Sequence, residues 1–152
     1  MRIWIDADGC PNEVKQVVFR ASERLQVAVL LVANVEMPTP RWPLVSSVRV
    51  SHDFDAADDH IAETVSAGDL VVTADVPLAA RVVEKGAVAV GPRGEIYDES
   101  NAAERLAMRN FMQELRAGGY IQGGPPAFGV GDKKKFAAAL DRLLAQRLGK
   151  QR

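Results

Sequence analysis

Side chains able to act together in a reaction occur in three short segments of the sequence. The first contains Asp6 and Asp8, the second contains Asp58, and the third contains Thr73 and Asp75. Carboxylates that crowd together need a counter-ion or raised pKa values. Mg²⁺ or Mn²⁺ suits such a group, and a bound ion of this kind can activate water against a phosphodiester. If the segments meet, they predict a metal-dependent phosphodiesterase site.

Two of these acids stand out because of where the pattern puts them. Strand alternation places Asp6 on the same face as Trp4, in a strand that is covered on both sides, where an unpaired carboxylate is costly. Asp58 shares a helical face with Ile61 and Val65, so it would lean over the strand ends. The predicted metal ligands are Asp6, Asp8, Asp58 and Asp75, and the predicted catalytic residues are Asp6, Asp58, Asp75 and Thr73, which would position water or a ligand.

Each of these acids also has a purely structural interpretation. Asp6 and Asp8 could satisfy the N–H groups at the start of the next helix, and Asp75 could cap the helix that follows Pro77. Asp55 is best explained as a helix cap. Asp59 is best explained as a first-turn acid favoured by the helix dipole. Only convergence of several acids at one place would favour the chemical interpretation.

The elements that would position these residues alternate along the chain. Apolar runs and helical periodicity predict strands at 2–6, 27–33, 46–50, 70–73 and 87–90, a small edge strand at 95–97, and helices at 11–25, 56–67, 77–85, 102–117 and 133–148, with a loop at 123–131. This alternation predicts an α/β fold with a mainly parallel sheet. With the strand order 3-2-1-4-5, the first and fourth strands are neighbours. Their carboxyl ends then share one pocket.

Length, composition and charge limit the classes of protein to which the chain could belong. The 152 residues predict a single domain over 1–152, and 47% hydrophobic with 26% charged residues is ordinary for a globular chain. A net charge of −1 argues against a non-specific nucleic-acid coat, and the single cysteine, Cys10, excludes an intrachain disulfide framework. No apolar run approaches a membrane span. We expect a cytoplasmic protein, with Cys10 as a small packed residue.

Basic side chains in the last third of the chain are candidates for contacts with a nucleic-acid backbone. Arg105 and Arg109 lie one helical turn apart, and Lys133 and Lys134 open the last helix, where cations are not favoured by the helix dipole. Surface ion pairing and a solvated face are the alternatives. The expected partner is RNA or DNA, and the oligomeric state is left open.

Several motifs together resemble those of the YaiI/YqxD family. They are Asp6-Ala7-Asp8-Gly9-Cys10-Pro11, Phe54-Asp55-Ala56-Ala57-Asp58, Gly68-Asp69-Leu70-Val71-Val72-Thr73-Ala74-Asp75-Val76-Pro77-Leu78-Ala79, Pro92-Arg93-Gly94, Arg109-Asn110-Phe111-Met112 and Gly123-Gly124-Pro125-Pro126. That family looks like a divergent branch of the PIN-like nucleases.

The resemblance implies a three-layer PIN-like domain with extra C-terminal helices, and metal-dependent cleavage of RNA or DNA. Asp6, Asp58 and Thr73-Ala74-Asp75 match the positions of the acids and of the Thr-x-Asp motif in PIN domains. PIN domains usually carry a fourth acid. Here Asp8, Asp59 or Asp98 could take that position, so the number of metals stays open.

Two other functions remain open. In a haloacid-dehalogenase-type phosphatase, Asp6 would be the nucleophile and Asp8 the acid/base, although Cys10 stands where that motif usually has Thr or Val. The second alternative is a nucleic-acid or protein-binding module whose pocket has lost its activity.

Overall fold

Strands and helices alternate along most of the chain as far as the last parallel strand. A computed structural model of the chain describes residues 1–124 and 126–149. Its elements in chain order are β1 (Arg2–Asp6), α1 (Asn12–Leu25), β2 (Ala28–Ala33), β3 (Val45–Arg49), α2 (Ala56–Thr64), β4 (Leu70–Val72), α3 (Val76–Glu84), β5 (Val88–Val90), β6 (Ile96–Tyr97), α4 (Ala102–Ala117) and α5 (Val130–Gly149). Residue 125 of the predicted 123–131 loop and residues 150–152 lie outside the described residues.

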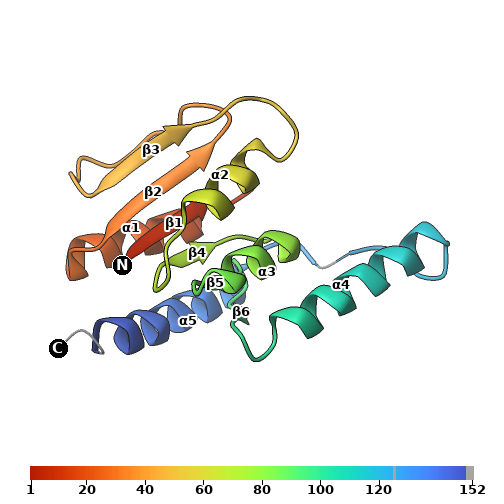
Figure 1. Ribbon diagram of the computed structural model, residues 1–152. Helices are drawn as coiled ribbons and strands as arrows, with labels where there is room; N and C mark the ends of the chain where they lie inside the picture. The colour runs from red at the N-terminus through yellow and green to blue at the C-terminus, as the bar shows by residue number, and fades with distance from the viewer. Residues whose placement is uncertain (125, 150–152) are drawn as a thin grey trace.

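One sheet joins all six strands in the order β3-β2-β1-β4-β5-β6 (Figure 1). The first five strands run parallel, and β6 pairs antiparallel with β5. The α/β class, the order 3-2-1-4-5 and the small edge strand are therefore confirmed. Because β1 pairs with β4 in register Ile5↔Val72, the residues that follow these two strands emerge side by side.

Helices cover both faces of the sheet, which gives three layers (Figure 1). Ile3 and Ile5 point into an apolar cluster formed with α1 and α5, whereas Trp4 points into a second cluster formed with α2 and α3. All three side chains are almost fully buried. Strand alternation then puts Asp6 on the Trp4 side of β1, facing α2 and α3, as the sequence predicts.

Helix ends differ from the predictions where local bonding decides them. α2 stops at Thr64 instead of residue 67, because Val65 is already extended (φ −61°, ψ 145°). α5 begins at Val130 instead of 133, and Asp132 bonds from within its first turn back to the N–H of Gly129 at 3.0 Å. Asp55 stands at the predicted cap position of α2, at φ 62°, but without a capping bond from its side chain.

Among the described residues, no helix has both the length and the apolar composition needed to cross a membrane.

Candidate active site

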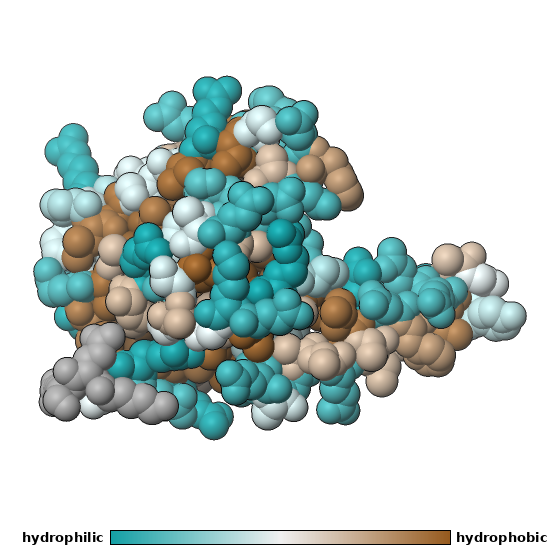
Figure 2. Space-filling model, in the orientation of Figure 1, coloured by the Kyte–Doolittle hydropathy of each residue, from teal (hydrophilic) through white to brown (hydrophobic). Residues whose placement is uncertain are grey.

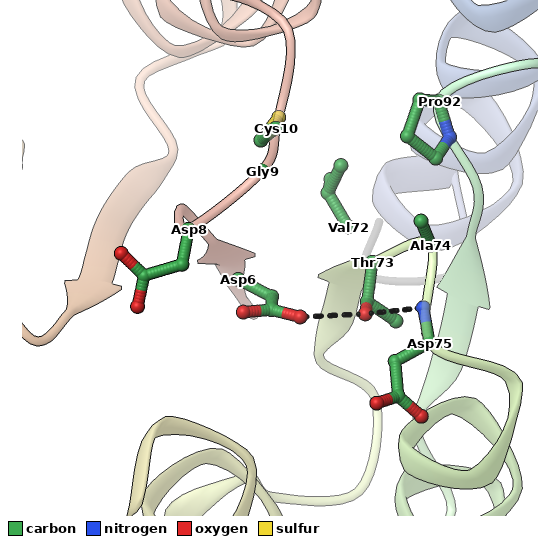
Figure 3. A pocket seen from close by; sticks show the side chains of 9 residues that line it. All are labelled: Asp6, Asp8, Gly9, Cys10, Val72, Thr73, Ala74, Asp75 and Pro92. Atoms are coloured by element: carbon green, nitrogen blue, oxygen red, sulfur yellow. Dashed lines mark hydrogen bonds between the residues drawn. The ribbon is translucent and has the colours of Figure 1, made fainter. Parts of the chain in front are cut away.

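The acidic site is built on two strand ends that a threonine hydroxyl links. Thr73, which directly follows β4, is 2% exposed, and its hydroxyl donates to Asp6 Oδ2 at 2.9 Å (Figure 3). The same hydroxyl oxygen accepts a hydrogen bond from the backbone N–H of Asp75 at 3.0 Å. Thr73 therefore fixes the orientation of the Asp6 carboxylate relative to the backbone of Asp75.

Asp75 both caps a helix and faces the site. Its Oδ1 accepts the backbone N–H of Leu78 at 3.0 Å, and Pro77 occupies the first turn of α3, where its missing N–H costs nothing. The cap interpretation of Asp75 is thus confirmed. One carboxylate oxygen is used in this way, and the carboxylate also lies beside Asp6 and Thr73 (Figure 3).

Asp58 approaches the other two acids from the first turn of α2. The pKa of Asp58 is raised to about 7, chiefly by burial and then by the charges of Asp75 and Asp6 and a side-chain interaction with Asp75. Burial also raises the pKa of Asp6 to about 6, against the lowering effect of the Thr73 hydrogen bond. The charges of Asp6 and Asp75 thus act on Asp58, so carboxyls from three separate segments face one region of the fold.

Asp8 lies at the same opening but faces another way. Its side chain is exposed, and Oδ2 accepts the backbone N–H of Asn34 at 3.2 Å. Figure 3 shows its carboxylate pointing away from Thr73 and Asp75. Asp8 raises the pKa of Asp6 through its charge, so it belongs to the electrostatic surroundings of the site.

Two cavities meet at Asp6 and Asp8. The first, of about 330 Å³, extends toward Thr73, Asp75 and Pro92 (Figure 3). The second, of about 350 Å³, extends over residues 51–58, between β3 and α2. Phe54 lines this second cavity, and 93% of its surface is exposed. Exposure of a loop residue is not readable from the sequence, so a place for Phe54 beside the acids could not be predicted.

Comparison with known proteins assigns the chain to a family. The family model described as "Uncharacterized BCR, YaiI/YqxD family" matches residues 4–146. The chain belongs to the YaiI/YqxD family. The resemblance seen in the sequence is thereby confirmed at the level of this family.

Several curated relatives match this YaiI/YqxD protein over nearly its whole length. A UPF0178 protein of Citrifermentans bemidjiense is 58% identical over 152 residues, which cover 100% of this chain and 99% of the relative. A UPF0178 protein of Trichlorobacter lovleyi is 56% identical over 146 residues, covering 96% and 95%. One of Shewanella sp. MR-7 is 50% identical over 145 residues, covering 95% of each. No solved structure matches the chain.

The donor set suits a hard cation, although it is not arranged as a finished cage. Within the described residues, the ion pairs of aspartates are made by Asp59, Asp69, Asp132 and Asp141, and none involves Asp6, Asp58 or Asp75. Carboxylate oxygens are the ligands that Mg²⁺ prefers. No three acidic, imidazole or thiol side chains of residues 1–124 and 126–149 converge as a ready-made ion site. An ion would therefore need rotations of the aspartate side chains.

The other acids considered in the sequence have their own partners. Asp59 pairs with Arg81 at 2.9 Å on the surface, and Asp98 accepts bonds from the hydroxyl and N–H of Ser100. Hydrogen bonding with Ser100 lowers the pKa of Asp98. Neither acid lines the two cavities. Of the three candidates for a fourth acid, only Asp8 borders the site.

Sequence reasoning gave no role to Asp69, which is 3% exposed at the amino end of β4. Its carboxylate accepts the Trp4 indole N–H at 3.0 Å, the Ser66 N–H at 3.0 Å and the Arg2 backbone N–H at 3.0 Å, with the Arg2 guanidinium at 3.4 Å. This buried acid therefore ties β1 to β4 at the edge of the sheet remote from the site. An aspartate before a strand carries no signal for this role.

The predicted basic contacts lie outside both acidic cavities. Arg105 and Arg109 are exposed on α4, with Arg105 stacked 5.5 Å from the Tyr97 ring. Lys133 and Lys134 lie near the start of α5, and the next residue, Lys135, lies against Gly94 in the turn after β5. A Cβ at Gly94 would lie 2.8 Å from the carbonyl oxygen of Lys135, so only glycine allows this close approach.

Cys10 lines the first cavity, but its chemistry is that of a buried thiol. Burial raises the pKa of Cys10 to about 12, and the nearby Lys15 lowers it by a smaller amount. The thiolate is the nucleophilic form of cysteine. Cys10 is therefore held as the thiol near neutral pH, which agrees with its interpretation as a packed residue.

Proposed function

We propose that this protein is a Mg²⁺- or Mn²⁺-dependent phosphodiesterase that cleaves RNA or DNA. The observation that supports the proposal is the cluster of Asp6, Asp58 and Asp75, drawn from β1, α2 and the end of β4. Close carboxylates without a basic partner repel one another, and a divalent cation relieves that repulsion. The PIN-like ancestry that the motifs imply would place the same chemistry at these positions.

Each residue would have a distinct part in the reaction. Asp6, Asp58 and Asp75 would hold the ion, and Thr73 would keep the Asp6 carboxylate aimed at it through the 2.9 Å hydrogen bond. Asp8 would attract the ion from the rim and could join its ligands after a rotation. When bound, the ion would supply a water of lowered pKa and would stabilise the leaving oxygen.

Features around the cavities favour a nucleic acid over a small phosphate ester. The ring of Phe54 is almost wholly exposed beside the acids, and an unpaired base can stack on such a ring. Arg105, Arg109, Lys133 and Lys134 would contact backbone phosphates farther along the strand. We place the activity in the cytoplasm, where a lone cysteine would stay reduced.

The phosphatase alternative has less support from the geometry. That mechanism needs the second aspartate to give a proton to the group that leaves the first. Asp8 instead accepts the Asn34 N–H and points away from the Thr73 side of Asp6.

Cleavage of short fluorescent RNA and DNA strands tests the proposal. Wild-type protein should cleave one of them with Mg²⁺ or Mn²⁺ and stop when EDTA is added. Asp6→Asn should abolish cleavage. Thr73→Val, which removes the hydroxyl but keeps the shape, should lower the rate by about 10- to 100-fold. Thr73→Ser should retain most of the activity, because serine keeps the hydroxyl.

Asp59→Asn is the matched control. It removes an acid next to Asp58 in the same helix, but Asp59 is paired with Arg81 on the surface, so cleavage should be unchanged. Equal cleavage by wild type and Asp6→Asn would refute the mechanism. Tight binding of RNA that EDTA does not alter, without cleavage, would favour the binding module. Trapping of a phospho-aspartate at Asp6 would favour the phosphatase.

A further inference from the structure

Helix α4 runs back along α3 toward the acidic site and continues past it. Its start lies at the amino edge of the sheet, where residues 98–100 line a cavity together with residues 86–88, just after the end of α3. α3 has nine residues and begins beside its cap, Asp75, whereas α4 has sixteen. The last turns of α4 therefore extend as an arm beyond the end of α3 that carries Asp75 (Figure 1).

Three arginines lie along one side of this arm and form what we call the arginine face. Arg105, Arg109 and Arg116 point within about 40° of one another around the helix, at 3.6 residues per turn. Ala102, the buried residue of α4, points within about 60° of all three. The side of α4 that is buried at its start thus continues along the arm as the arginine face. Figure 2 shows hydrophilic side chains along the upper side of the arm, beside the hollow between the arm and the rest of the fold.

The guanidinium groups of this face keep N–H donors available for a ligand. All three side chains are exposed, and none forms an ion pair in the part of the chain that the structure describes. Arg109 Nη1 donates to Asn110 Oδ1 at 3.1 Å. Arg116 Nε donates to the carbonyl oxygen of Gly123 at 3.3 Å. Because a guanidinium has five N–H donors, each of these bonds leaves several donors for another partner.

Charge is segregated around α4, although the whole chain has a net charge of −1. Glu104 and Glu114 point about 100° or more away from every arginine of the face. We propose that the arginine face holds the phosphodiester backbone of single-stranded RNA or DNA and leads the strand into the acidic site. Guanidinium groups match phosphate oxygens in geometry as well as in charge.

The dimensions of the arm fit a polynucleotide better than a mononucleotide. Eleven residues separate the first and last arginine, a rise of about 16 Å, which corresponds to roughly five stacked nucleotides of one strand. A single strand is favoured because the exposed ring of Phe54, in the cavity between β3 and α2, can stack on an unpaired base. The identity of the ligand rests on the proposed function, but its binding to the arm can be measured without cleavage.

Fluorescence anisotropy with labelled single strands of about 16 nucleotides, in EDTA so that nothing is cleaved, tests the arm. Arg109→Gln and Arg116→Gln should each weaken binding by about 3- to 10-fold, and Arg105→Gln by less, because the charge of Asp98 lies near Arg105. The triple glutamine variant should lose about 100-fold. It should also flatten the slope of log K against log salt by about 2, since each phosphate contact on a single strand contributes about 0.7. RNA and DNA of different base sequence should lose affinity by the same factor, because phosphates carry no sequence.

Two controls separate the face from charge in general. The triple lysine variant keeps the three charges and should retain most of the salt slope. Arg142→Gln removes the same charge from an exposed position on α5 and should bind as the wild type does. Glutamine and arginine have similar helix propensity, so α4 should keep its circular dichroism signal in all these variants.

The outcomes distinguish this inference from the proposed activity. A triple glutamine variant with wild-type affinity and salt slope would overturn the role of the arm, even if the wild type cleaves RNA or DNA with Mg²⁺. An equal loss in Arg142→Gln, or a loss that depends on base sequence, would overturn it as well. Loss of binding in the triple variant alone, with a wild type that never cleaves, would support the arm and refute the phosphodiesterase.

Discussion

Replacing Asp6 by asparagine should stabilise the metal-free protein, although it should remove activity. Asp6 is partly buried beside Asp75, and its pKa in the folded protein is raised to about 6, chiefly by burial. Asparagine has the same shape and cannot ionise. Its side-chain oxygen can still accept the Thr73 hydroxyl, which now donates to Asp6 Oδ2 at 2.9 Å. The substitution therefore removes a charge with little change in packing.

The pKa shift gives the sign and the size of the effect. The pKa of Asp6 is 3.8 before burial and about 6 in the fold, so between these values the folded chain binds more protons than the unfolded chain. The stability that comes from this extra proton is complete below pH 3.8 and is lost as pH rises through about 6. The shift of about two units corresponds to at most about 3 kcal/mol. Above that pH, Asp6→Asn should gain between about 1 and 3 kcal/mol.

Urea unfolding in EDTA, followed by tryptophan fluorescence, measures this gain. Near pH 8, the midpoint for Asp6→Asn should lie about 1 M above that of the wild type, given a slope of roughly 2 kcal/mol/M for a chain of this size. Near pH 4 the two midpoints should nearly coincide. Saturating Mg²⁺ should then raise the wild-type midpoint and leave the variant unchanged, because only the wild type would bind the ion.

Asp59→Asn provides the control, since the Asp59–Arg81 pair is on the surface and its loss should change stability by no more than about 0.5 kcal/mol. If Asp6→Asn proved less stable than the wild type near pH 8, hydrogen bonds in the folded protein would have to stabilise the Asp6 carboxylate, and the reasoning above would be refuted. An equal gain at both pH values would show that the effect is not one of ionisation.

Three further substitutions and labels probe other parts of the fold. Asp69→Ala should cost about 3–5 kcal/mol in the free energy of unfolding, because it leaves the buried Trp4 indole and Arg2 N–H groups without their acceptor; thermal and urea unfolding would measure the loss. Phe54→Ala should weaken binding of a single-stranded oligonucleotide by the equivalent of about 1–3 kcal/mol in a titration, without changing stability, whereas Phe54→Trp should keep the affinity. Cys10, with its pKa raised to about 12, should resist iodoacetamide in the folded protein near neutral pH and react once urea exposes it, as mass spectrometry would show.

The sequence predicted the strands that carry the site, because strands are encoded in short-range patterns. The apolar runs at 27–33 and 70–73 carry the marks of strands covered on both faces, and alternation alone put Asp6 on the Trp4 side of β1. The neighbouring positions of β1 and β4 then followed from the common topology of open parallel sheets. The proximity of Asp6 and Asp75 is a consequence of that topology.

Other features depend on contacts that sequence patterns do not encode. Thr73 and Asp6 are 67 positions apart, and so are Asp69 and Arg2, so neither bond is visible locally. The direction of the Asp8 carboxylate depends on the N–H of Asn34, a residue in the loop after β2. Likewise, helical periodicity predicted α4 over its observed range but could not show that Met108 and Phe111 would remain exposed.

The two ends of β4 show why acidic residues alone do not identify a site. At the amino end, the buried carboxylate of Asp69 accepts hydrogen bonds from Trp4, Ser66 and Arg2. At the carboxyl end, Asp6 has the Thr73 hydroxyl, and its pKa rises because burial and neighbouring acids oppose its charge. A carboxylate whose oxygens already accept several hydrogen bonds holds the strands together. A carboxylate whose oxygens still have free acceptor positions is able to bind a cation, so the proposed metal site is expected at the second end.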